Sequence, residues 1–116
     1  ILSIAVSWAE TINAKAIYIG AVEEDSSGYP DCRQSFFKSF QKVVKYGTKP
    51  ETKILIQTPL IKLSKSEIIK KGIKMNAPLN FTWSCYKSET IPCEECDSCV
   101  IRKIGFEKAK IIDPIL

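Results

Sequence analysis

Four of the five cysteines lie within fifteen positions of one another, and closely spaced thiols are the most chemically informative feature of this sequence. The pattern C-x7-C-x2-C-x2-C is formed by Cys85, Cys93, Cys96 and Cys99. Thiolates at two-residue spacing let a tight loop fold around one ion, and four of them complete the tetrahedral shell of Zn²⁺. A closed shell leaves no position for a water molecule. The spacing therefore predicts a structural zinc site, in which Lys87 or Arg102 offsets the excess negative charge.

Two other uses of these cysteines stay open at this point. Disulfide pairing fits poorly with five cysteines and with the lack of a secretion signal in residues 1–6. An iron–sulfur cluster also uses closely spaced cysteines, although the C-x3-C-P continuation of a ferredoxin motif is absent. The fifth cysteine, Cys32, is distant in sequence from the other four and has no visible base beside it. We interpret it as a small packing residue.

Composition limits the remaining chemistry. The chain has 116 residues and no histidine, which excludes Ser-His-Asp and Cys-His catalysis and mixed Cys/His metal sites. A net charge of +4 is compatible with a phosphate-bearing partner but does not establish one. Hydrophobic residues make up 45% of the chain, which favours a folded domain, and no apolar run is long enough to span a membrane. The chain starts with Ile1 inside a helical pattern, so we expect a cytoplasmic fragment of a longer protein.

The positions of the cysteines depend on elements that the hydrophobic pattern predicts. Helical spacing of apolar residues indicates a helix tail over 1–13, and short apolar runs at 15–20 and 53–57 are typical of parallel strands buried on both faces. Between the strands, an apolar stripe predicts a helix that packs on the sheet or, as the second interpretation, on a partner subunit. That stripe consists of Phe36, Phe37, Phe40, Val43 and Val44.

The second half of the chain changes character. Ser64 and Glu67 predict a capping box at the start of another helix, and this alternation of helices and strands indicates an α/β fold. We expect a parallel sheet with flanking helices over residues 1–76. A zinc-binding loop and a closing helix at about Asp97–Ala109 then form a subdomain over residues 77–116.

Several ordered segments carry a more specific pattern. They are S-G-Y-P-D-C-R at 27–33, L-S-K-S-E-I at 63–68, T-W-S-C-Y at 82–86 and C-E-E-C-D-S-C at 93–99. Taken together with Arg102 and the Asp113–Pro114 pair, they closely resemble the 7-cyano-7-deazaguanine synthase family. The resemblance covers essentially the whole chain but about the C-terminal half of the family's domain.

The resemblance implies a fold and an activity. The family has an adenine-nucleotide α-hydrolase-like fold, one zinc ion held by four cysteines, and homodimeric members. It converts 7-carboxy-7-deazaguanine, ammonia and ATP to 7-cyano-7-deazaguanine, a precursor of queuosine in tRNA, without direct contact to nucleic acid or membrane. Its S-G-G-x-D-S phosphate loop is absent here. We therefore expect this chain to hold the metal and part of the substrate surface without completing the ATP site alone.

The polar loop at residues 23–33 is a candidate substrate surface, because ligands bind beyond the carboxyl ends of strands in open α/β sheets. Asp25 or Asp31 could accept hydrogen bonds from a purine-like N–H edge, and Tyr29 could stack on the base. Arg33 could pair with a carboxylate or phosphate. The alternative is an ordinary solvated loop before a helix.

Two further residues have a functional and a structural interpretation. Lys65 lies in the first turn of its helix, where it could hold ATP phosphates and stabilise the leaving pyrophosphate, or be one exposed cation of a basic helix. Trp83 lies two positions before the first ligand cysteine, Cys85, and could form a wall of the substrate pocket, or pack under the zinc loop.

Two alternative functions remain. A zinc-stabilised nucleic-acid-binding module would suit the positive charge, although the cysteine loop is acidic and no aromatic residues alternate with the lysines. A tRNA-modifying sulfurtransferase of the ATP pyrophosphatase group would need cysteines that act on sulfur, and four of them are already assigned to metal.

Overall fold

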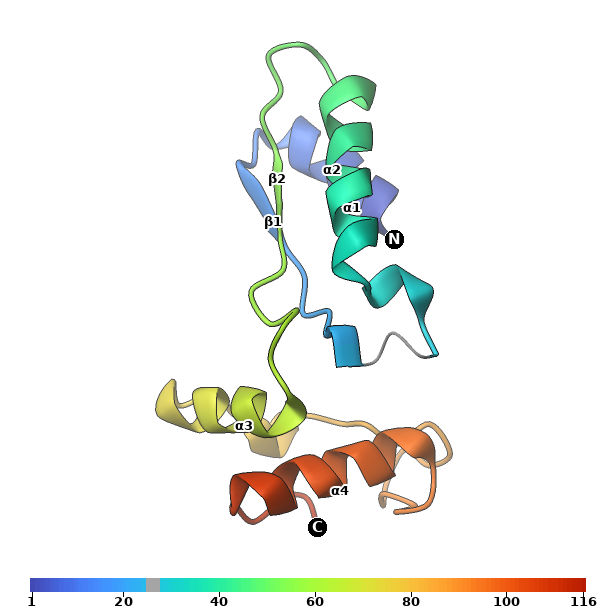
Figure 1. Ribbon diagram of the computed structural model, residues 1–116, viewed down its shortest axis with the longest axis vertical. Coiled ribbons are helices and arrows are strands. Elements are labelled where there is room, and N and C mark those ends of the chain that lie inside the picture. Colours follow the sequence, from blue (N-terminus) through green and yellow to red (C-terminus); the bar gives the residue numbers. More distant parts are fainter. Residues whose placement is uncertain (25–27) are drawn as a thin grey trace. The chain divides into compact units, whose positions relative to one another are not determined.

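Two short strands form a parallel pair in the computed structural model, which describes residues 1–24 and 28–116 (Figure 1). β1 spans Ala16–Tyr18 and β2 spans Leu55–Gln57, with Ala16 opposite Leu55 and Tyr18 opposite Gln57. The predicted strands and their parallel pairing are confirmed. The chain divides into two compact units, residues 1–62 and 63–116.

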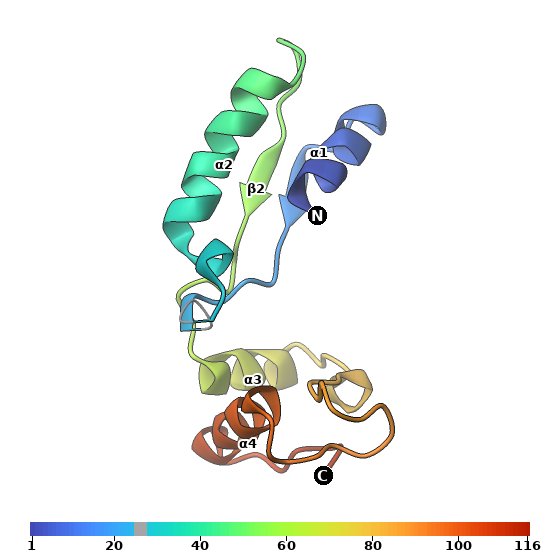
Figure 2. The ribbon, with the colours of Figure 1, turned by 90° about the vertical axis from the view of Figure 1, so that its right-hand side faces the viewer.

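In the first unit, helices α1 (Leu2–Thr11) and α2 (Gln34–Gly47) cover the same face of the two strands (Figures 1 and 2). Side chains from both helices and from both strands meet in one apolar cluster. Its buried members are Val6, Ala9, Val44 and Ile54, with Ala14, Ile17, Phe40 and Ile56 packed against them. Within the predicted apolar stripe of α2, Phe37 and Val44 are buried, whereas Val43 is 60% exposed.

The expectation that both strands are buried on both faces is wrong in this structure. Ile17 and Ile56 face the helices, but Tyr18 and Leu55 on the opposite face are 74% and 55% exposed. Successive side chains of a strand point to opposite faces, so helices that cover one face leave every second residue uncovered. Within the described residues, no element covers that second face.

The outer edge of β2 is closed by a side chain of α2. The Gln41 amide Nε2 donates to the Ile54 carbonyl at 3.0 Å, and the Ile56 N–H donates to Gln41 Oε1 at 2.8 Å. These two backbone groups point away from β1, because the intervening Leu55 N–H donates to Lys15 on the β1 side. An amide therefore satisfies the groups that another strand would otherwise pair.

The second unit consists of α3 (Lys65–Lys74), the short 3₁₀ helix η3 (Leu79–Phe81) and α4 (Asp97–Ala109), with α3 and α4 packed together (Figure 2). Ile69, Phe106 and Ala109 form its apolar core. Gly105 allows close approach of the two helices, because a Cβ at this position would lie 2.9 Å from Lys65 Cβ.

The helix ends in this unit follow the sequence closely. The Ser64–Glu67 capping box is confirmed: Ser64 Oγ accepts from the Glu67 N–H, and the Glu67 carboxylate accepts from the Ser64 N–H at 2.8 Å. The closing helix has the predicted bounds, and Lys110 ends it in the left-handed conformation at φ 59°.

The contact pattern groups α3 with α4. The division after residue 76 concerns the organisation of the complete domain, and it stays a prediction. Across the two described stretches, no helix combines the length and the apolar character required to cross a lipid bilayer.

Candidate metal centre

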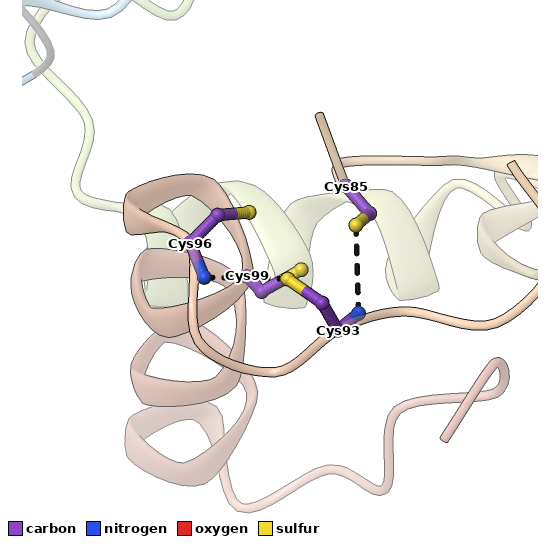
Figure 3. Close-up of side chains that lie close together, drawn as sticks. All are labelled: Cys85, Cys93, Cys96 and Cys99. Carbon is purple, nitrogen blue, oxygen red and sulfur yellow. Dashed lines mark hydrogen bonds between the residues drawn. The ribbon is translucent and has the colours of Figure 1, made fainter. Parts of the chain in front are cut away.

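The four cysteines of the sequence motif converge on one point of the second unit (Figure 3). Their sulfur atoms all lie within 4.8 Å of one another. All five cysteines lie in the described ranges, and none of them forms a disulfide. The cluster contains the residues that the spacing predicts, and it could hold a metal ion.

Different elements supply the ligands. Cys96 is the N-cap of α4 and Cys99 lies in its first turn, so both occur at the helix end whose dipole favours negative charge. Cys93 comes from the loop before this helix, and Cys85 comes from the segment that follows η3. Cys85 and Cys99 are the most enclosed, at 9% and 5% exposure.

Backbone amides hold the sulfur atoms in place. The Cys93 N–H donates to Cys85 Sγ at 3.4 Å, and the Cys96 N–H donates to Cys93 Sγ at 3.3 Å (Figure 3). Between Cys93 and Cys96, Glu94 has a left-handed backbone with φ 59°, which bends the chain sharply. The loop therefore already contains N–H donors directed at sulfur, the arrangement that stabilises thiolates bound to a cation.

The thiols differ in their acidity. The Cys93 N–H is the main cause that lowers the pKa of Cys85 to about 6. The Tyr86 amide is the main cause that lowers the pKa of Cys96, whereas burial raises the pKa of Cys99 to about 11. The Cys99 thiolate thus requires a neighbouring positive charge, which a bound cation supplies.

Lysines and carboxylates surround the cluster. Lys87 Nζ lies 3.3 Å from Glu95, which raises the pKa of Lys87, with a smaller contribution from the sulfur of Cys93. Lys87, one of the two cations predicted to offset the thiolate charge, thus interacts electrostatically with the cysteines. The guanidinium of Arg102 is instead paired with Asp113.

The donor set fits one tetrahedral ion. Structural zinc sites commonly have a shell of four soft sulfur ligands, here supplied by a loop and by the start of a helix. Such a shell leaves no open coordination position on the ion. The same set also binds iron in some proteins, so the cysteines alone do not identify the element.

The segment before Cys85 is fixed by its own contacts. The indole Nε1 of Trp83 donates to the Ser88 carbonyl at 3.1 Å, while the side chain stays 43% exposed. The Ser84 hydroxyl is buried without a hydrogen-bond partner among the described residues, and Ser84 lines a small pocket together with Cys99 and Arg102.

The other predicted site residues fall into both units. Asp25 lies outside the described residues. Tyr29, Asp31 and Arg33 belong to the first unit, where they are exposed in and around the 3₁₀ helix η2 (Pro30–Cys32). Lys65 belongs to the second unit as the first residue of α3.

Sequence reasoning missed the polar network of Arg102, Asp113 and Thr82. Both oxygens of the Asp113 carboxylate accept from the Arg102 guanidinium, which also donates to Thr82 Oγ1 at 2.9 Å. A sequence signal existed, because Arg102 follows Cys99 by three residues and so lies on the same face of the helix.

Comparison with known proteins gives consistent matches. A model of the family described as "Queuosine biosynthesis protein QueC" matches residues 1–110. Three similar relatives carry the name 7-cyano-7-deazaguanine synthase. The relative from Chloroherpeton thalassium is 59% identical over 114 residues, which cover 98% of this chain and 50% of the relative.

The relative from Chlorobium phaeobacteroides (strain DSM 266) is 60% identical, with the same 98% and 50% coverage. The relative from Nautilia profundicola is 59% identical and is covered to 51%. The chain thus spans about half the length of the curated relatives that it matches.

Proposed function

Because this chain belongs to the family of the queuosine biosynthesis protein QueC, we propose that it is the C-terminal half of a 7-cyano-7-deazaguanine synthase. One observation carries the proposal: the family match spans residues 1–110 and therefore includes all four clustered cysteines. The relatives' length supports the assignment to a half, since the chain covers 50% of the first of them.

In the proposed reaction, the complete enzyme is an ATP-dependent carbon–nitrogen ligase. ATP activates the carboxylate of 7-carboxy-7-deazaguanine by adenylation, ammonia displaces the adenylate to give an amide, and a second activation dehydrates the amide to the nitrile. We propose that the enzyme acts in the cytoplasm as a homodimer. ATP binding would depend on a phosphate loop that this sequence does not contain.

The metal in this proposal is one Zn²⁺ per chain. Cys85, Cys93, Cys96 and Cys99 would bind it, and their convergence within 4.8 Å supports the assignment. The ion would cross-link the loop to the start of α4. A shell closed by four sulfur atoms gives it a structural role, because no position is left for a substrate oxygen.

We propose that the loop after β1 contacts the substrate. Tyr29 would stack on the base, Asp25 or Asp31 would accept its N–H groups, and Arg33 would bind the carboxylate or a phosphate. The exposure of Tyr29, 58%, supports a role for its ring face in contact with a ligand.

Two residues of the second unit are also proposed to contact ligands. Lys65 follows the cap of α3, where the positive end of the helix dipole supports a contact with ATP phosphates. Trp83 would form a wall of the substrate pocket. Its support is the hydrogen bond to Ser88, which fixes the indole while leaving it half-exposed.

The proposed fold of the complete domain is an adenine-nucleotide α-hydrolase-like sheet with a zinc-binding subdomain at residues 77–116. The parallel pairing of β1 with β2 and the crossover through α2 support it. The exposed face of Tyr18 and Leu55 also suits a sheet that has further cover in the complete domain.

The test is to fuse the first half of the Chloroherpeton thalassium relative to this chain and supply 7-carboxy-7-deazaguanine, ammonium and ATP. Mass spectrometry should detect the nitrile only when all three substrates are present. The control is the relative itself, assayed in parallel. A folded, metal-loaded fusion that makes no amide and no nitrile, beside an active control, would refute the proposal.

A further inference from the structure

Arg102 occupies an unusual position for an arginine. Its side chain is only 11% exposed, and that of its partner Asp113 is 4% exposed. Nε and Nη2 donate to the two carboxylate oxygens of Asp113, with an Nη2–Oδ1 distance of 2.7 Å. This two-point pairing fixes the plane of the guanidinium as well as its position.

The remaining arm of the guanidinium reaches the segment that leads to the metal cluster. Nη1 donates to Thr82 Oγ1 at 2.9 Å and to the Thr82 carbonyl at 3.4 Å. The ring of Phe106 lies beside the guanidinium, with Cζ 5.1 Å from the ring centroid. A single side chain thus joins α4, the segment before Cys85 and the end of the chain.

Both members of the Arg102–Asp113 ion pair also form hydrogen bonds with other groups. The Asp113 carboxylate accepts from Arg102 and also from the Ile115 N–H at 3.2 Å. Removing either charge would leave the other buried without a partner, which is strongly unfavourable. The network is therefore expected to hold one geometry.

Arg102 connects the two segments that carry the ligands farthest apart in sequence, α4 with Cys99 and the segment that leads from Thr82 to Cys85. Cys93, Cys96 and Cys99 lie within seven residues of one another, whereas Cys85 lies eight positions before the first of them. Closing that longer loop carries the largest ordering entropy in the site. Arg102 is one turn from Cys99, and Thr82 is three residues from Cys85.

We propose that Arg102 is a positioning residue of the metal centre, which holds the Thr82–Cys85 segment against α4 so that Cys85 is in place before the ion binds. This inference rests on the proposed metal site. It assigns Arg102 no contact with the ion. Its function is preorganisation, which lowers the entropy loss on binding.

Three variants of the full chain test the proposal. Arg102→Lys keeps the positive charge beside Asp113 but loses the two-point geometry. Thr82→Val keeps the Arg102–Asp113 pair and removes the hydroxyl that connects it to the Cys85 segment. Lys108→Met is the matched control, because it removes an exposed cation from the same helix.

Zinc affinity is measured on the reduced chain by competition with a chromophoric chelator. We expect Arg102→Lys to bind zinc 10- to 100-fold more weakly, the range typical of residues behind metal ligands. Thr82→Val should bind more weakly by a smaller factor, and Lys108→Met should bind as the unchanged chain does. Circular dichroism of each variant establishes that it is folded.

Cobalt(II) substitution separates positioning from a general loss of stability. Displacement of Cys85 in Arg102→Lys should lower the sulfur-to-cobalt charge-transfer absorbance per bound ion, because fewer thiolates are bound. Unchanged zinc affinity and absorbance in both Arg102→Lys and Thr82→Val would overturn the inference while leaving the metal site intact. An unchanged chain that binds neither metal would instead overturn the metal site itself.

Discussion

The two units of the molecule are stabilised in different ways. The first has an apolar cluster formed by two helices and both strands, and a glutamine amide closes one edge of its sheet. The second has a smaller apolar core, Ile69, Phe106 and Ala109, beside a buried ion pair and four clustered thiols. A unit of this size with so small a core usually needs a metal or disulfides. We therefore expect the second unit to depend on its metal-binding residues for stability and the first unit not to.

Metal removal should give the largest difference between the units. Structural zinc contributes an apparent free energy of about 10–16 kcal/mol in zinc-finger peptides, so a chelator should unfold residues 77–116 first. Hydrogen exchange should show lost protection around Cys85–Cys99, with β1 and β2 unchanged. Equal loss of protection in both units would contradict the comparison.

A cavity created in the core of the first unit should destabilise that unit by the same amount with and without bound metal. Ile54 is 3% exposed in the apolar cluster, so Ile54→Ala should lower the free energy of unfolding of that unit by about 2–5 kcal/mol. Urea denaturation followed by hydrogen exchange should give the same loss with and without chelator. A loss that depends on chelator would show that the units are coupled.

Overpacking tests the helix pair of the second unit. A Cβ at Gly105 would lie 2.9 Å from Lys65 Cβ and 3.1 Å from Ile69 Cδ1, so Gly105→Ala should destabilise this unit by about 1–3 kcal/mol. The matched control is Gly72→Ala in α3, whose nearest contact would be an ordinary 3.4 Å. That control should be neutral or stabilising, since alanine favours helix. Thermal unfolding that ranks the two variants in the reverse order would refute the close approach.

Acid should lower the free energy of unfolding of each unit through the protonation of one glutamate. We expect this effect to be smaller than those of the preceding variants. Hydrogen bonds from Thr52 lower the pKa of Glu10 in the first unit, and those from Ser64 lower the pKa of Glu67 in the second. A carboxyl whose pKa is lower when folded stabilises above the ordinary value of 4.5, and this contribution is lost as pH falls through the folded pKa. Glu10→Gln and Glu67→Gln should each reduce the slope of the free energy of unfolding against pH in the acid range, in the unit that contains the substitution. A slope that neither variant changes would exclude these contacts as its source.

Local signals were sufficient for much of the fold. The capping box, the bounds of α4 and the parallel strands are encoded within short stretches of sequence, and the cysteine spacing predicted the cluster. Burial on both strand faces was predicted wrongly, because exposure depends on elements that a strand's own residues do not specify. The Arg102–Asp113 pair was missed for a related reason. It depends on the left-handed turn at Lys110, which brings the chain end back to α4.

X-ray absorption at the zinc edge of the purified, reduced chain tests the central claim most directly. We expect one zinc ion per chain, with four sulfur neighbours at about 2.3 Å and no nitrogen or oxygen in the shell. Iron in place of zinc, a shell with fewer than four sulfur atoms, or a metal-free chain whose cysteines have paired as disulfides would contradict it.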